Sequence, residues 1–376
     1  MDFALNEDHL ALRDAVQRFC DGEYPAEHRG NPETGPQGRQ RWQAMAELGL
    51  LGLPLPADLG GSEQGPVELM LVAQEFGRAL GGGAWLASTV MAGQLLARLG
   101  NEAQKQQWLP GLANGELQAA LALQEAGTRY EWQQVSAQAS RQAGGYVLNG
   151  RKTMVLAGDT ADLLLVVART SGTGNERQGL SVLAVDSSAA GVQVQGFDTL
   201  DGRRAAHVSF DQVLVPQHCL LGEADQAADA IEAVIDAANA VLCAEAAGAV
   251  ESLLAQTSDY LKTRRQFGAP LAKFQVLQHR VADIAIALEQ LKSMAAAAAA
   301  AQGDEAGKRR RVVSAAKAYA SQQGRQIGLA AIQLHGGMGM TDECRVGHYA
   351  KRLIQIGQMF GDSAWHLQRV AANPAT

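Results

Sequence analysis

Hydrophobic residues recur at helical spacing in the first third of the chain. Val16 and Phe19 lie about one helical turn apart, and Asn6 stands before them at a position that suits a helix N-cap. A second periodic stretch covers residues 68–80, beyond a break that is rich in Gly and Pro. The pattern predicts an N-terminal α-helical domain over residues 1–118.

The pattern changes between residues 119 and 224, where short β-branched stretches, several with period two, are separated by Gly, Asn, Asp and Ser. These stretches cover 117–124, 134–140, 145–150, 152–158, 162–170, 179–186, 192–197 and 207–215. They are not interleaved with helical patterns, so a Rossmann-type parallel sheet is not expected. The segment predicts an antiparallel β domain, a barrel or a sandwich.

Long helical patterns return after residue 224. Residues 229–263 predict one helix of about 50 Å, at about 1.5 Å per residue. Further helices are expected at about 272–301 and 305–334, and a shorter one from 342 on. Helices of this length usually lie antiparallel, so residues 225–376 predict a C-terminal four-helix-bundle domain. The predicted fold class is therefore α+β and multidomain, in the order helical, β, helical.

The composition and charge of the chain exclude some classes of binding partner. The chain has 376 residues, a formal net charge of −7 and 47% hydrophobic residues, which argues against nucleic acid or an anionic membrane as a partner. The basic run at 308–311 is interpreted as a solvated helix face. Apolar runs such as 294–301 are too short to span a bilayer.

The cysteines and the N-terminus bear on the compartment. Cys20, Cys219, Cys243 and Cys344 are far apart and show no CxxC spacing, so no disulfide framework is expected. The N-terminal residues show neither the basic nor the apolar region of a signal peptide. We therefore expect a cytoplasmic protein.

No metal or nucleophile site is predicted. The histidines at 335, 348 and 366 lack HExxH or HxxxH spacing, and the first of them belongs to a Gly-rich turn where a structural role is expected. There is no Gly-x-Ser-x-Gly motif.

The stretch TRRQFGAPLAKFQ at 263–275 admits two interpretations. It can be a helix stop, because cations suit a helix C-terminus, Gly268 can turn left-handed and Pro270 prevents continuation. It can also be a binding element, because the Arg264 guanidinium is a planar fork that suits a phosphate and Phe267 can lie against a flat ring.

Two motifs together carry a resemblance to a known family. RRQFGAPLAKFQVLQHRVADI at 264–284, followed by AIQLHGGMGMTDE at 331–343, resembles the acyl-CoA dehydrogenase family of flavoproteins. Weaker similarities, in family order, cover 48–61, 121–127 and 150–166. The resemblance implies FAD, an acyl-CoA substrate, α,β-dehydrogenation, electron-transfer flavoprotein as the electron acceptor, and a homo- or heteromeric dimer or tetramer.

The resemblance also assigns cofactor residues. Arg264 would hold the pyrophosphate of FAD, and Gln333, Gly336 and Gly337 would contact the same cofactor across a subunit interface. The adenine end of a partner's flavin would be lined by Gln266, Phe267, Leu271 and Gln275.

The chain departs from the family at the catalytic base. The Glu-Gly-Thr turn that usually supplies a glutamate reads Phe360-Gly361-Asp362, and the alternative base position is Ala238. Phenylalanine cannot accept a proton, but the Phe360 N–H remains to bind the thioester oxygen, as the resemblance implies. Two positions beside the flavin also differ, because Thr-Glu-Pro reads Gln-Glu-Ala at 124–126 and Trp-Ile-Thr reads Met-Val-Leu at 154–156.

Several explanations remain open. Another carboxylate can serve, with Asp362 the first candidate and Glu245 the second, although a turn or cap residue and an interhelical partner are their ordinary roles. The chain can be one subunit of a heteromer whose sister chain supplies the base, or a non-catalytic partner that completes a sister chain's site. It can also act differently on a CoA or carrier-bound thioester, and a ligand-free helical scaffold is the remaining alternative.

Overall fold

The computed structural model describes residues 5–25 and 35–372. The first four residues of the stretch considered for a signal peptide lie outside this range. The described chain forms two compact units, one from residues 5–25, 66–82 and 239–372, the other from residues 35–65 and 83–238. The helices of the N-terminal segment are therefore divided between the two units.

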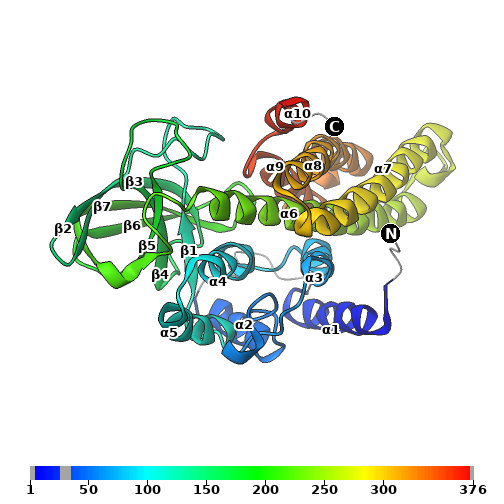
Figure 1. Cartoon of the computed structure of the whole chain (residues 1–376). Coiled ribbons are helices and arrows are strands. Elements are labelled where there is room, and N and C mark those ends of the chain that lie inside the picture. The colour runs from blue at the N-terminus through cyan, green and yellow to red at the C-terminus, as the bar shows by residue number, and fades with distance from the viewer. Residues whose placement is uncertain (1–4, 26–34, 373–376) are drawn as a thin grey trace. The chain divides into compact units, whose positions relative to one another are not determined.

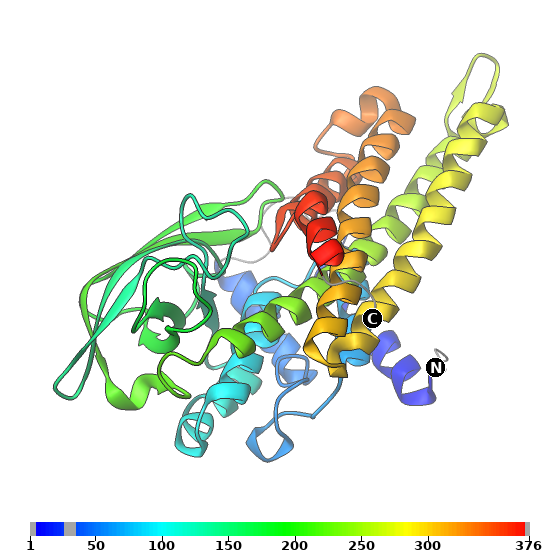
Figure 2. The ribbon, with the colours of Figure 1, turned by 45° about the horizontal axis from the view of Figure 1, so that its top comes forward.

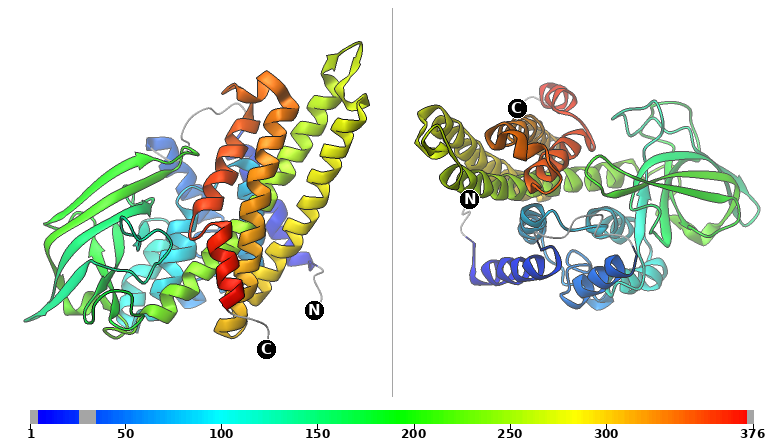
Figure 3. Two further views of the ribbon diagram at one scale, coloured as in Figure 1. Left: turned by 90° about the horizontal axis from the view of Figure 1, so that it is seen from above. Right: turned by 180° about the vertical axis from the view of Figure 1, so that it is seen from behind.

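The first unit holds the predicted long helices. Its elements are α1 (Glu7–Glu23), α3 (Pro66–Ala79), most of α6 (Ala228–Thr263), α7 (Gln275–Ala300), α8 (Ala306–His335), α9 (Arg345–Gln358) and α10 (Ser363–Ala372). The predicted helices at 68–80, 229–263, 272–301 and 305–334 are confirmed to within a few residues. Figure 3 shows α7, α8 and α9 side by side, and α8 packs against α7, α9 and α10.

The region from 342 on was predicted as one helix and forms two. Phe360 has a φ of 53° and Gly361 a φ of 125°, values that an α-helix does not accommodate. The chain therefore turns between α9 and α10, where the resemblance leads us to expect a catalytic glutamate.

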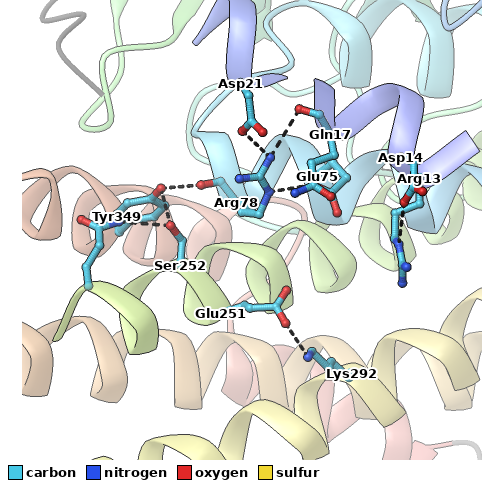
Figure 4. A network of polar contacts seen from close by, with 11 residues as sticks. Arg13, Asp14, Gln17, Asp21, Glu75, Arg78, Glu251, Ser252, Lys292 and Tyr349 are labelled. Carbon is cyan, nitrogen blue, oxygen red and sulfur yellow. Dashed lines mark hydrogen bonds and ion pairs between the residues drawn. The ribbon is translucent and has the colours of Figure 1, made fainter. Parts of the chain in front are cut away.

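Polar contacts join the N-terminal helices of this unit to the bundle (Figure 4). The Asn6 side chain caps α1 by accepting from the His9 N–H, as the sequence predicted. Arg78 on α3 donates to Glu75 at 2.7 Å and to Asp21 of α1 at 2.8 Å. The Tyr349 hydroxyl of α9 bonds the Ser252 hydroxyl of α6 and the carbonyl of Arg78. These bonds fix α1, α3, α6 and α9 against one another.

Two glycines allow α3 and α6 to approach closely. A methyl group at Gly77 would lie 2.0 Å from the Glu245 carbonyl oxygen, and one at Gly248 would lie 1.8 Å from the Gln74 carbonyl oxygen. Both distances are far below van der Waals contact, so any side chain at either position would push the helices apart.

The second unit contains the β domain, the helices α2 (Gly35–Glu47), α4 (Gln94–Leu99) and α5 (Glu102–Ala113), a π-helical segment at Leu86–Gly93 and the first residues of α6 (Figure 1). The strands are β1 (Ala119–Ala122), β2 (Gln138–Gln142), β3 (Gly145–Leu156), β4 (Leu163–Arg169), β5 (Leu180–Asp186), β6 (Val192–Asp198), β7 (Arg204–Pro216) and β8 (Leu220–Leu221). They form one sheet in the order β6-β7-β3-β2-β4-β5-β8, with β1 paired to β4.

The sequence predicted an antiparallel sheet, but two of its strand pairs are parallel. β1 pairs with β4 in parallel, with Ala119 opposite Leu163, and β2 meets β4 in parallel at Gln138 and Arg169. The β2–β3 hairpin lies between β1 and β4 in sequence, and this long excursion returns the chain in the same direction. The two stretches predicted at 145–150 and 152–158 are one long strand, β3, with irregularities in its register to β7.

Within residues 5–25 and 35–372, two helices, α6 and α7, are long and apolar enough to cross a membrane by length and composition alone. The apolar window of α6 is entirely buried within the protein. Burial of this kind is what the central helix of a bundle requires.

Candidate functional site

The predicted helix stop is also a hairpin. α6 ends at Thr263, and Arg264 still donates its backbone N–H to the Tyr260 carbonyl at 2.8 Å. The chain then forms a two-stranded ribbon, Arg265–Gln266 against Ala269–Pro270. Phe267 and Gly268 occupy the turn with φ of 53° and 76°, the left-handed pair that a two-residue type I′ hairpin needs. Figure 2 shows this ribbon projecting beyond the end of the bundle, between α6 and α7.

The structure brings the two family-like motifs together at one end of the bundle. The ring of Tyr260 on α6 stacks on the ring of His335 on α8, with centroids 4.4 Å apart, and the Tyr260 hydroxyl donates to the His335 carbonyl at 3.2 Å. Burial lowers the pKa of His335, and its Nδ1 bonds the Ala331 carbonyl at 2.9 Å. His335 therefore has the structural role expected from the sequence, and it places the turn at 336–337 beside the end of α6.

The predicted cofactor residues are exposed at this end of the bundle. Phe267 is 89% exposed. Arg264 is exposed as well, and no side-chain hydrogen bond of its guanidinium occurs within 5–25 and 35–372. The remaining exposed members are Gln266, Gln275, Gln333, Gly336 and Gly337, while Leu271 is half-buried.

A cation, a flat ring and amide groups thus face outward together. The cation and the amide groups can bind a phosphate, and the ring can lie against a planar base. Because these groups are exposed, they fit a cofactor that a second chain helps to enclose. Their binding role stays a prediction.

The turn at 359–362 lies where the resemblance leads us to expect a catalytic glutamate. Phe360 is half-buried, and its left-handed backbone costs about 1 kcal/mol or more for a non-glycine residue. The turn is held from inside the bundle by Lys317 of α8, whose ammonium donates to the carbonyls of Met359 at 2.9 Å and Gly361 at 3.0 Å. Lys317 was not among the residues predicted for the site, although a charged residue in the apolar run VVSAAKAYA is a signal for a buried cation.

The two candidate carboxylates have structural partners. Asp362 caps α10, since its Oδ1 accepts from the Trp365 N–H at 2.9 Å. Glu245 is buried and accepts two bonds from the Arg352 guanidinium, at 2.7 and 2.6 Å. The interhelical role of Glu245 is confirmed, whereas service of Asp362 as a base stays a prediction. Ala238, at the alternative base position, is fully buried.

In the β domain, the altered motif at 124–126 is built around a buried ion pair. Glu125 accepts from Lys152 at 2.7 Å and from the backbone N–H groups of Ser136 and Ala137. Burial, partly offset by Glu125, lowers the pKa of Lys152 to about 8. Burial alone would favour the neutral form of Glu125, but Lys152 and the hydrogen bonds outweigh it and lower the pKa of Glu125. The pair therefore fixes this loop on β3.

The second altered motif lies at an irregularity of β3. Met154 has a φ of 51°, and the register between β3 and β7 shifts between Lys152 and Val155. The preceding Thr153 bonds His207 of β7 at 2.8 Å. The bulge re-aims the side chains at this point of the strand.

Comparisons with known proteins agree with this architecture. Three family models match the chain in order, the acyl-CoA dehydrogenase N-terminal domain at 6–116, the middle domain at 120–213 and the C-terminal domain at 228–373. A probable acyl-CoA dehydrogenase of Bacillus subtilis, YngJ, is 28% identical, with 95% of this chain and 96% of the relative covered. The mitochondrial isovaleryl-CoA dehydrogenase of Solanum tuberosum is 30% identical, with 86% and 79% covered.

Solved structures show the same fold. A chain of the ChsE4–ChsE5 complex of Mycobacterium tuberculosis matches with a TM-score of 0.88 and 26% identity, over 100% of this chain and 100% of that one. The FAD complex of PigA matches with a TM-score of 0.91 and 24% identity, over 99% of this chain and 98% of that one. With all three domains matched in sequence and fold, the chain belongs to the acyl-CoA dehydrogenase family.

Proposed function

We propose that this protein carries out FAD-dependent α,β-dehydrogenation of an acyl-CoA thioester, as one subunit of an oligomer in the cytoplasm. FAD is the cofactor, and an electron-transfer flavoprotein is the proposed electron acceptor. Family membership supports the oxidoreductase class.

One observation carries the cofactor assignment. Arg264, Phe267 and Gln333 come from two segments of the bundle and lie exposed at the end where Tyr260 stacks on His335. In the proposed complex, Arg264 forms charge-assisted bonds to the pyrophosphate and Phe267 covers the adenine end of a cofactor shared with another chain.

This chain contributes a hydrogen-bond donor for the thioester, but it has no carboxylate at either of the usual base positions. Bound FAD supplies the hydride acceptor. The Phe360 N–H donates to the thioester oxygen, where negative charge develops as the α-proton leaves. The proton needs a base that neither Phe360 nor Ala238 can provide, so Asp362 or a carboxylate of a sister chain must remove it.

Exposed apolar side chains support an oligomer. A monomer exposes few large apolar groups close together, and such patches mark interaction surfaces. Several of the exposed large apolar side chains of this chain lie on the hairpin, on α7, on α8 and on the turn that follows α8, at Phe267, Val276, Ile286, Leu329, Met338 and Met340. We propose that these elements contact a related dehydrogenase subunit, and the similarity to the ChsE4–ChsE5 complex supports a heteromer.

The Phe360 substitution favours a second candidate, a non-catalytic subunit that completes the site of a sister chain. The two candidates differ in what this chain does alone. Purified protein is examined for bound flavin by its visible absorbance and then mixed anaerobically with acyl-CoA esters of different chain length. Bleaching by this chain alone establishes an active subunit. Flavin and bleaching that need co-expression with a sister dehydrogenase establish the heteromer, and a colourless protein in both preparations refutes the flavoprotein proposal.

A further inference from the structure

A fully buried lysine supports the turn at Phe360. The Lys317 side chain is 0% exposed, in the middle of α8, and its ammonium reaches the carbonyl oxygens of Met359 and Gly361 at 2.9 and 3.0 Å. A third contact joins it to the Ser321 hydroxyl at 3.4 Å. Burying an ammonium costs free energy unless hydrogen bonds compensate for the lost water. The bonds to the carbonyls of Met359 and Gly361 provide this compensation and hold the lysine in place.

The geometry of the peptide bond links this contact to the Phe360 N–H. Every peptide in the described chain is trans, and in a planar trans peptide the carbonyl oxygen and the amide hydrogen point in opposite directions. The carbonyl of Met359 and the N–H of Phe360 belong to the same peptide. An ammonium bonded to that carbonyl therefore fixes the Phe360 N–H so that it points away from Lys317.

The Phe360 N–H is also available for a ligand. No hydrogen bond from it to another group occurs within the described residues. The neighbouring groups are committed elsewhere, since the Met359 N–H donates to carbonyls of α9 and Asp362 caps α10. A positive charge on the carbonyl side of a peptide also polarises its N–H, as in a chain of hydrogen bonds.

We propose that Lys317 is a positioning residue for the proposed reaction: it orients and polarises the Phe360 N–H as the donor to the carbonyl oxygen of the acyl-CoA thioester. The inference rests on the proposed function. It assigns a role in that reaction to Lys317, whose side chain contacts neither cofactor nor substrate. It explains why the turn keeps its strained left-handed form although the usual glutamate is absent.

The charged state of Lys317 depends on the groups around it. Burial lowers its pKa to about 8, while Cys243 of α6 and Asp362 oppose the shift. His366 of α10, which also lies near this turn, has its pKa lowered by burial, by Lys317 and by Arg369, and so stays neutral near pH 7. The ammonium therefore loses its proton near pH 8, and the polarisation of the Phe360 N–H is lost with it.

The test compares two ligands that differ in one oxygen atom. An acyl-CoA thioester can accept the Phe360 N–H, whereas the S-alkyl-CoA thioether of equal chain length cannot. Binding of both to the FAD-loaded protein, with a sister subunit if one is required, is measured by calorimetry for wild type and Lys317→Met. Lys292→Met is the matched control, because this lysine of α7 is partly exposed and pairs with Glu251.

We expect Lys317→Met to weaken thioester binding roughly tenfold and to leave thioether binding unchanged, because the donor remains but is no longer oriented or polarised. The wild-type preference for the thioester should decline above pH 8, and this decline should be absent in Lys317→Met. Equal weakening of both ligands in Lys317→Met and in Lys317→Gln refutes the inference, because it indicates a structural role. A wild-type protein that binds neither FAD nor CoA ligands refutes the proposed function itself.

Discussion

The buried ion pair between Glu245 and Arg352 allows a sharp test of the bundle's energetics. The pair joins α6 to α9, and the side chains are 5% and 3% exposed. Each carboxylate oxygen accepts one guanidinium N–H, at 2.7 and 2.6 Å. The perturbations are Glu245→Leu, Arg352→Met and the double variant that makes both changes.

The three variants should differ in a defined order. Removal of one partner of a buried pair costs about 3–5 kcal/mol, because a charge remains in the bundle interior. Glu245→Leu should be the worse single change, since a guanidinium stays charged whereas an isolated carboxyl can take up a proton. The double variant should lie within about 2 kcal/mol of wild type, because apolar groups of similar size replace a pair whose desolvation was costly.

The unfolding free energy is measured by urea denaturation for all four proteins between pH 5 and 8. Arg352→Met should lose stability as pH rises, because the native state holds a proton that the unfolded state releases. Glu245→Leu and the double variant should lack this slope. Additive single changes, or a double variant as unstable as Glu245→Leu, would refute the assignment of the pair as a coupled buried contact.

Three further predictions follow from the packing and the site. Gly248→Ala should lower the unfolding free energy by about 1–3 kcal/mol, because the added methyl group clashes with α3. Gly22→Ala should not, because no atom lies within 4 Å of a methyl group at that position, and the melting temperatures of the two variants test this difference. His366 has its pKa lowered to about 2, mainly by burial, so the unfolded state binds a proton that the native state does not, and stability should fall by about 1.4 kcal/mol per pH unit below pH 6.5. His366→Leu should flatten this acid slope in urea titrations, and an unchanged slope contradicts the assignment. Arg264→Ala should release FAD on gel filtration, because a charge-assisted bond is worth about 1.5–3 kcal/mol, while Lys262→Ala retains it; full flavin occupancy in Arg264→Ala refutes the clamp.

The sequence predicted the features that depend on neighbours along the chain. The Asn6 cap, the helix at 229–263 and the left-handed Gly268 follow from periodicity, side-chain capping and backbone freedom, which act over a few residues. The order of helical, β and helical segments follows from the same local patterns. The resemblance carried by 264–284 and 331–343 added the family, which the comparisons confirm.

The tertiary structure decided which distant groups meet. Lys317 bonds a turn more than 40 residues away, and the partners Glu245 and Arg352 are 107 residues apart. The parallel pairing of β1 with β4 likewise depends on where the chain returns after a hairpin. Local periodicity shows which face of an element is apolar, but it does not show which face of another element covers it. Buried charges therefore find partners that packing alone selects, and packing places Lys317 behind the peptide that joins Met359 to Phe360.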